Sequence, residues 1–216
     1  IYLGLPTRYL PGRRVLTDDE ARRIGTPTKW NYVNDCTNIL LASARGGDNF
    51  QRTFMEAFVR PGEDLQNWTS RANYAARGIV QTGSRELSLY VKHHSGYPSN
   101  HVRRYVIRAD GFASVQAPYA GGEFITKPFI FSGEKLSLNF ATSAVGGLFV
   151  EIQTADEKPI EGFSHQDCRE LIGDRIDQTV TWKHGTDVSR LAGKPIRLRI
   201  VMKDADLYSL QFSGSD

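Results

Sequence analysis

Short apolar runs alternate with polar positions along most of the chain, and Gly, Pro, Asn and Asp separate these runs at near-regular intervals. In one run, Leu87, Leu89 and Val91 share one face of an extended segment, whereas Ser88 and Tyr90 share the opposite face. This period of two, with many Val, Ile, Tyr and Phe residues, is typical of half-buried β-strands. We therefore predict an all-β protein with strands in residues 1–10, 38–45, 54–60, 76–82, 86–94, 101–110, 112–117, 127–131, 135–142, 147–154, 177–183, 195–204 and 206–212.

Two segments carry a helical signal instead. Thr17 stands three residues before Glu20, which is the spacing of a capping box, and Gly25 follows the charged run, so we predict one short helix there. Residues 165–171 (HQDCREL) also have a helical pattern. Further on, the run from Asp204 to Asp206 predicts the turn of a hairpin, with the two carboxylates interpreted as turn caps rather than calcium ligands.

A domain boundary is expected near residue 122. Gly121 and Gly122 end the first set of strands, and a clean alternation resumes after Pro128 and continues to the C-terminus. Pro128 has no N–H for a strand ladder and favours an extended residue before it, so it suits the start of an edge strand. We expect a first domain in residues 1–122 and a second in 123–216, whose length and short strands suit a β-sandwich.

Charge and composition narrow the classes of partner. The 27 Lys and Arg residues stand against 24 Asp and Glu residues, a formal charge of +3, which gives no electrostatic reason to expect nucleic acid. No run approaches the roughly 18 apolar residues that a membrane span needs. Cys36 and Cys168 lie in unrelated contexts and are interpreted as two buried thiols. The sequence shows no Ser-His-Asp arrangement, phosphate loop or Cys-Cys metal spacing, so we expect no metal and no cofactor.

Three segments of the second half carry a resemblance to a known family: residues 159–168 (PIEGFSHQDC), 180–199 (VTWKHGTDVSRLAGKPIRLR) and 203–212 (KDADLYSLQF). They resemble the C-terminal sandwich of bacterial glycoside-hydrolase-like proteins related to the five-bladed β-propeller enzymes of families 32 and 43. Upstream, residues 56–68 (EAFVRPGEDLQNW) and 103–117 (RRYVIRADGFASVQA) resemble the last propeller blades of the same proteins. The resemblance covers nearly the whole chain.

This resemblance implies incomplete β-propeller blades in residues 1–122, followed by a C-terminal β-sandwich. A blade needs about four strands, so residues 1–122 supply fewer than two blades. Earlier blades, which carry the acidic residues of the central funnel in such proteins, are expected before Ile1. The expected partners are therefore a carbohydrate and either a missing N-terminal propeller portion or another chain.

Substrate-binding residues are expected just before and at the end of one strand. Residues 67–80 (NWTSRANYAARGIV) place Trp68, Arg71 and Tyr74 before what the resemblance makes the innermost strand of the last blade. Aromatic rings and guanidinium groups suit sugar recognition. His93 ends the next strand, where it is expected at the rim. Packing between blades is the alternative for these residues.

The catalytic residues stay unknown at this stage. Glycoside hydrolysis needs two carboxyl groups across the scissile bond, and Glu56, flanked by apolar residues, is the first candidate acid. Glu56 also fits an outer-strand residue paired with an arginine. We expect a secreted or periplasmic carbohydrate-active protein that is part of a glycoside hydrolase, or alternatively a non-catalytic carbohydrate-binding or structural β-sandwich module.

Overall fold

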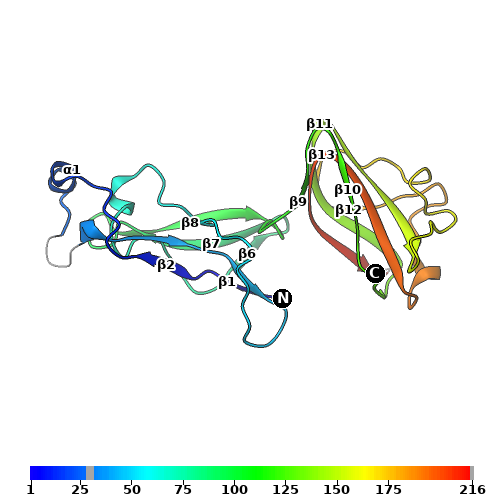
Figure 1. Ribbon diagram of the computed structural model, residues 1–216, viewed down its shortest axis with the longest axis horizontal. Helices are drawn as coiled ribbons and strands as arrows, with labels where there is room; N and C mark the ends of the chain where they lie inside the picture. Colours follow the sequence, from blue (N-terminus) through cyan, green and yellow to red (C-terminus); the bar gives the residue numbers. More distant parts are fainter. Residues whose placement is uncertain (28–31, 215–216) are drawn as a thin grey trace. The chain divides into compact units, whose positions relative to one another are not determined.

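A computed structural model describes residues 1–27 and 32–214 of the chain (Figure 1). The chain divides into two compact units, Ile1–Ile107 and Arg108–Asp216. Both consist of antiparallel β-strands with a few short helices, so the all-β prediction is confirmed.

The first unit contains eight strands, one α-helix and two 3-10 helices in its described part. They are β1 (Tyr2–Gly4), β2 (Thr7–Leu10), α1 (Asp18–Arg23), η1 (Tyr32–Asn34), β3 (Cys36–Ile39), β4 (Ala42–Ala44), η2 (Leu65–Asn67), β5 (Tyr74–Ala75), β6 (Val80–Gly83), β7 (Glu86–His93) and β8 (His101–Arg108), the last residue of which belongs to the second unit. β1 pairs with β4, β2 pairs with β3, and β5, β6 and β8 all pair with β7.

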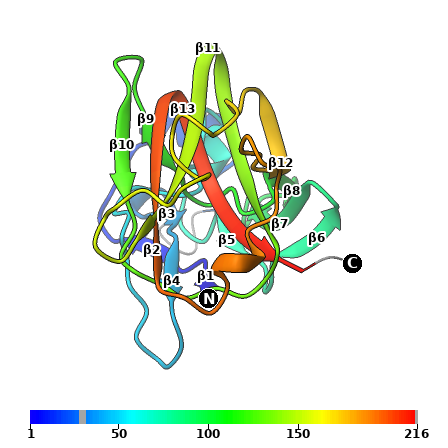
Figure 2. The same cartoon turned by 90° about the vertical axis from the view of Figure 1, so that its right-hand side faces the viewer.

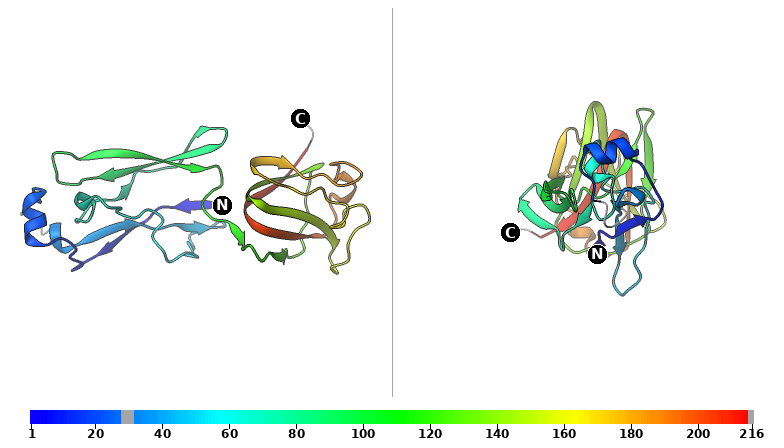
Figure 3. Two further views of the ribbon diagram at one scale, coloured as in Figure 1. Left: turned by 90° about the horizontal axis from the view of Figure 1, so that it is seen from above. Right: turned by 90° about the vertical axis from the view of Figure 1, so that its left-hand side faces the viewer.

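Two layers of strands make up the first unit. Figure 3 shows the blue strands β1 to β4 in one layer and the green strands β7 and β8 in the other. A small apolar core lies between the two layers. It consists of three buried residues: Ile39 of β3, Val91 of β7 and Val59, which lies outside the named strands. The expected strand at 54–60 is reduced to the single pairing of Val59 with Ile39. The four-stranded sheet has the size of a propeller blade, and the assignment to blades stays a prediction.

Within residues 108–214, the second unit contains five strands of its own and one 3-10 helix. They are β9 (Val115–Ala117), β10 (Gly122–Ile125), β11 (Lys135–Thr154), β12 (Asp174–Thr179), η3 (Ser189–Leu191) and β13 (Ile196–Ser213). β13 pairs with β9, β10 and β11, and β12 pairs with β11. Figure 2 faces this unit and shows the long strands β11 and β13 running side by side.

Strands β11 and β13 both bend in the middle, and this bend creates two layers (Figure 1). Their register shifts between Thr142 and Gly147, opposite Lys203 to Ala205, so each strand contributes one half to each layer. Gly146 permits the bend because a Cβ added there would clash with the carbonyl oxygen of Asp204. The predicted hairpin turn at Asp204–Asp206 is therefore wrong, since a bulge in one continuous strand takes its place.

The core of the second unit lies between these two layers, which is the arrangement of a β-sandwich. Along β13, Ile196, Leu198, Ile200 and Met202 are buried while the residues between them are more exposed, as the alternation predicted. Trp182 is buried, and its indole N–H donates a 2.9 Å hydrogen bond to the carbonyl of Val150 in β11. Trp182 therefore belongs to the core of the second unit.

The helix predictions have opposite outcomes. Helix α1 carries the predicted capping box, because Thr17 Oγ1 accepts from the Glu20 N–H and the Glu20 carboxylate accepts from the Thr17 N–H. Residues 165–171 form turns and bridges instead of a helix. Cys168 pairs with Trp182, and Leu171 pairs with Leu148 in β11, so sheet pairing overrides the helical pattern.

The boundary between the units lies between Ile107 and Arg108, earlier than the expected position near residue 122. Strand β9 explains the difference, because Ala117 and Val115 pair with β13 of the second unit. Gly122 begins strand β10 rather than ending a set of strands. The second unit therefore includes residues 108–122 as well as the expected 123–216.

Candidate functional site

A pocket of about 590 Å³ opens on the first unit and contains one of the predicted binding residues, Trp68. Strands β2 and β3, residues 56–62 and the indole of Trp68 form its walls. It is lined by Arg8, Leu10, Arg13, Cys36, Thr37, Asn38, Glu56, Ala57, Arg60, Pro61, Gly62 and Trp68.

Strand pairing places Arg8 in this pocket. Arg8 and Leu10 both line the pocket, as the period of two along β2 requires. Arg8 is opposite Asn38 of β3, and its Nε donates a 3.1 Å hydrogen bond to the Asn38 side-chain oxygen. Its Nη1 lies 3.4 Å from the carbonyl of Met55. These two contacts hold the guanidinium group of Arg8 at the pocket wall.

The indole of Trp68 is oriented by the segment that precedes it. The Trp68 Nε1–H donates a 2.7 Å hydrogen bond to the carbonyl of Gly62. Between these residues, Asp64 caps η2 by accepting from the Gln66 N–H at 3.1 Å, and the Asn67 amide donates to the carbonyl of Pro61 at 3.2 Å. Trp68 is half-buried, and its hydrogen-bonded indole lines the pocket.

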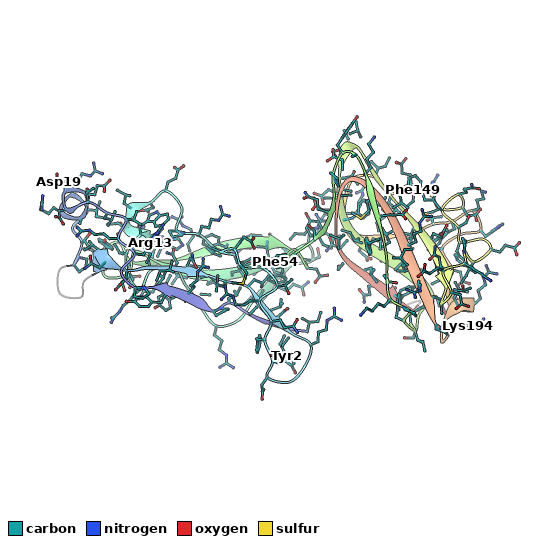
Figure 4. All side chains as sticks on the ribbon, viewed as in Figure 1. Tyr2, Arg13, Asp19, Phe54, Phe149 and Lys194 are labelled. Carbon is teal, nitrogen blue, oxygen red and sulfur yellow. The ribbon has the colours of Figure 1, made fainter. Side chains whose placement is uncertain are left out.

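Positive charge dominates the pocket lining. Arg8, Arg13 and Arg60 line it together with one carboxylate, that of Glu56. Arg13 follows β2 and is labelled in Figure 4. Glu56 is exposed to solvent rather than enclosed by apolar side chains. The pocket thus offers guanidinium donors, an aromatic face and one carboxylate acceptor.

Cys36 lines the same pocket but is not a nucleophile at neutral pH. Its thiol is buried and donates to the carbonyl of Arg13 at 3.1 Å. Burial raises the pKa of the Cys36 thiol above its ordinary value, with a smaller opposing effect from the charge of Arg13. The thiolate is the reactive form of cysteine, so Cys36 acts here as an apolar wall.

Arg71 and Tyr74 do not line the Trp68 pocket, and both act electrostatically on the hydroxyl of Tyr9. The pKa of Tyr9 is raised, chiefly by a hydrogen bond to the Asp35 carboxylate, and Tyr74 and Arg71 are close enough to act on it through their charges. Tyr9 and Tyr74 are 49% and 39% exposed, so two aromatic rings are open to solvent here. Arg71 has a positive φ of 65°, an uncommon conformation for a residue with a side chain.

His93 is buried rather than placed at a solvent-facing rim. Its ring stacks against those of His101 and Tyr105, and a 3.0 Å hydrogen bond joins its Nε2 to the Tyr105 hydroxyl. Burial, followed by the charges of Arg103, His101 and His94, lowers the pKa of His93 to about 4. His93 is therefore neutral at physiological pH and packs inside the first unit.

The structure also brings together an Asp, a His and a Ser that the sequence did not reveal as a group. Nε2 of His94 lies 2.6 Å from the Asp64 carboxylate, and Nδ1 lies 3.0 Å from Ser99 Oγ. Ser99 Oγ is also 2.9 Å from the side-chain oxygen of Gln66, and the His94 N–H donates to Asn67. We infer that these hydrogen bonds hold residues 94–99 against the η2 segment, which Trp68 directly follows.

A second pocket, of about 520 Å³, lies on the second unit. The rings of Phe149 and His165 line it with centroids 4.6 Å apart, together with Glu123, Glu170 and Lys203 (Figure 4 labels Phe149). An aromatic pair with both signs of charge is able to bind a polar ligand with apolar faces.

Comparison with other proteins adds no constraint on these sites. No protein-family model, no curated protein and no solved structure matches this chain. Within residues 1–27 and 32–214, no helix has the length and apolar character that crossing a membrane requires. In the same residues, no three His, Cys, Asp or Glu side chains come together in a way that would hold a metal ion.

Proposed function

We propose that this chain is part of a secreted or periplasmic carbohydrate-active protein and that its first unit binds a sugar in the Trp68 pocket. The observation that carries this proposal is the fixed indole ring beside several guanidinium groups in one pocket. A sugar ring has C–H faces that pack on an aromatic ring and hydroxyl groups that accept hydrogen bonds from arginine. The pocket matches both requirements.

Binding is the part of the activity that these residues support directly. Glycoside hydrolysis by the usual route needs an acid and a second carboxyl group on opposite sides of the scissile bond. Glu56 supplies one carboxylate to the pocket. In a hydrolase, the second group would come from the earlier propeller blades that the family resemblance implies, and the Trp68 pocket would then hold a sugar residue of the same substrate.

A non-catalytic glycan-binding module is the second candidate, and the pocket on the second unit favours it. Phe149 and His165 form an aromatic pair on the sandwich, next to the carboxylates of Glu123 and Glu170. If glycan binding depends on Phe149 and not on Trp68, the sandwich is the binding module and the first unit has a supporting role.

A glycan array with matched variants separates these candidates. We expect Trp68→Ala to reduce the array signal strongly relative to the wild-type protein and Phe149→Ala to leave it unchanged. The reverse pattern would assign binding to the sandwich. A parallel screen with aryl glycosides measures hydrolysis, and absence of any array signal from the wild-type protein would refute the proposed function.

A further inference from the structure

We propose that the Trp68 pocket selects sugars that carry an oxyanion, either a carboxylate, as in a uronic acid, or a sulfate ester. The inference rests on the proposed sugar binding at Trp68 and adds the chemical class of the sugar. Its basis is the charge of the pocket lining, in which the three guanidinium groups of Arg8, Arg13 and Arg60 meet the single carboxylate of Glu56.

Ion pairing separates these three arginines from some other arginines of the described residues. Six others form ion pairs with carboxylates: Arg14, Arg22, Arg104, Arg108, Arg197 and Arg199. Within residues 1–27 and 32–214, none of the three pocket arginines forms such a pair. The pocket therefore holds positive charge that no described carboxylate neutralises by direct contact.

The hydrogen-bonding capacity of the Arg8 side chain points in the same direction. A guanidinium group has five N–H donors. Arg8 uses Nε for Asn38 and Nη1 for the carbonyl of Met55, which fixes the group and leaves Nη2 without a partner among the described residues. A fixed guanidinium group with spare donors is suited to an oxyanion, because such charge-assisted hydrogen bonds are about twice as strong as neutral ones.

The carboxylate of Glu56 and the three arginines together determine which ligand the pocket accepts. Three positive groups around one negative group leave a net positive pocket, which a neutral sugar does not compensate. A sugar oxyanion compensates it, and Glu56 remains as an acceptor for sugar hydroxyl groups. The geometry thus requires two features of one ligand, a ring that packs on Trp68 and an anionic substituent that reaches the arginines.

Calorimetric titration with four probes tests the inference. The probes are trigalacturonic acid, its fully methyl-esterified form, a sulfated oligosaccharide and inorganic sulfate. The ester has the same ring skeleton as the acid but no charge. We expect either the acid or the sulfated sugar to bind at least about tenfold more tightly than the ester, as expected when hydrogen bonds to a charged group are lost. Which of the two binds more tightly identifies the anionic group.

Matched variants link the effect to the pocket. We expect the double variant Arg13→Gln, Arg60→Gln to lose about tenfold or more in affinity for the anionic sugar, with little change for the ester. Arg45→Gln is the control, because Arg45 is exposed and does not line the pocket. If the Gln variant unfolds, Arg13→Lys with Arg60→Lys keeps the charge and removes the planar fork that binds an oxyanion through two bonds.

Each outcome has a separate meaning. Equal affinity for the acid, the sulfated sugar and the ester would overturn the selection of oxyanions and leave sugar binding intact. Inorganic sulfate binding as tightly as the sulfated sugar would also overturn it, since the sugar ring would then contribute nothing. If none of the three oligosaccharides binds, this inference fails, and the glycan array decides separately whether the proposed sugar binding stands.

Discussion

The indole N–H of Trp68 donates a 2.7 Å hydrogen bond to the carbonyl oxygen of Gly62, and both residues line the same pocket. The bond fixes the plane of the ring before any ligand arrives, so little side-chain freedom is lost on binding. Preorganisation of this kind increases affinity because the cost of ordering the side chain is avoided. The aromatic ring of Trp68 and its hydrogen bond to Gly62 therefore make separate contributions to glycan affinity. Two substitutions at position 68 distinguish these contributions.

Trp68→Phe keeps an aromatic face and removes the bond to Gly62, whereas Trp68→Ala removes both. We expect Trp68→Phe to weaken glycan binding about threefold to tenfold and Trp68→Ala to weaken it further, in line with about 1 kcal/mol for each of these interactions. Calorimetry with the best glycan of the array measures both. Equal affinities of Trp68→Ala and the wild-type protein would show that the ring is not part of the site.

The buried His93 predicts a pH dependence of stability. Its pKa is about 4 in the folded chain against 6.5 for the free side chain, because burial, Arg103 and the neighbouring His101 and His94 disfavour the charged form, while Asp64 opposes them weakly. As the pH falls from 6.5 towards 4, the unfolded chain takes up a proton that the folded chain does not, so folding stability falls over this interval.

Replacement of His93 by Gln should flatten this dependence. We expect the wild-type first unit to lose on the order of 2 kcal/mol between pH 6.5 and 4.5, and His93→Gln to lose clearly less. Urea unfolding at a series of pH values measures the difference. His184→Gln is the control because His184 is exposed. If the wild-type protein and His93→Gln show the same dependence of stability on pH, the lowered pKa of His93 is not its cause.

The Asp64 to His94 contact predicts a coupling between two loops. Partial burial raises the pKa of the Asp64 carboxyl, but hydrogen bonds from His94 and from the Gln66 N–H more than offset this and hold it below 3.8. The stabilisation is therefore present above pH 3.8 and is lost as the pH falls through the lower folded value. Asp64→Asn should loosen both loops at neutral pH.

Hydrogen exchange provides the readout for that coupling. Faster exchange is expected at Tyr97 and Asn100, whose N–H groups bond within the loop that His94 begins. Asp48→Asn serves as the control, since Asp48 is exposed and outside the network. If hydrogen exchange changes only at residues next to position 64, the Asp64–His94 contact does not couple the two loops.

We expect an added methyl group at Gly146 to have a large effect on the stability of the second unit. A Cβ at this position would overlap the carbonyl oxygens of Lys203 and Asp204, where β11 and β13 bend together. We expect Gly146→Ala to destabilise the second unit by about 1–3 kcal/mol, since an overpacked site forces the backbone to move. Gly214→Ala is the matched control because open space surrounds that residue. Thermal unfolding compares the two variants. Equal unfolding midpoints would contradict the close approach of β11 and β13 at Gly146.

Local pattern predicted the parts of the fold that depend on local chemistry. The capping box of Thr17 and Glu20 and the buried face of β13 both follow from the residues themselves. The errors occurred where distant pairing decides the structure. Residues 165–171 have a helical pattern but pair with β11 and Trp182, and Asp204 sits in a bulge because the opposite strand presents Gly146.

The candidate site shows the same division. Trp68 was predicted to bind substrate from its type and context, and it lines the pocket. The arginines that accompany it come from separate segments, with Arg8 on β2 and Arg60 in a long loop, and no spacing along the chain connects them. Likewise Asp64 and His94 are 30 positions apart, so only the pairing of the sheets brings them together.

The most direct test of the account is the indole N–H spectrum of the 15N-labelled protein during titration with an oligogalacturonate. Loss of one peak in Trp68→Phe identifies the Trp68 signal, and the signal of Trp182, buried in the second unit, serves as an internal reference. The account predicts that the Trp68 peak shifts in a saturable way while the Trp182 peak stays in place. Saturable binding of the glycan that leaves the Trp68 peak unmoved would contradict it.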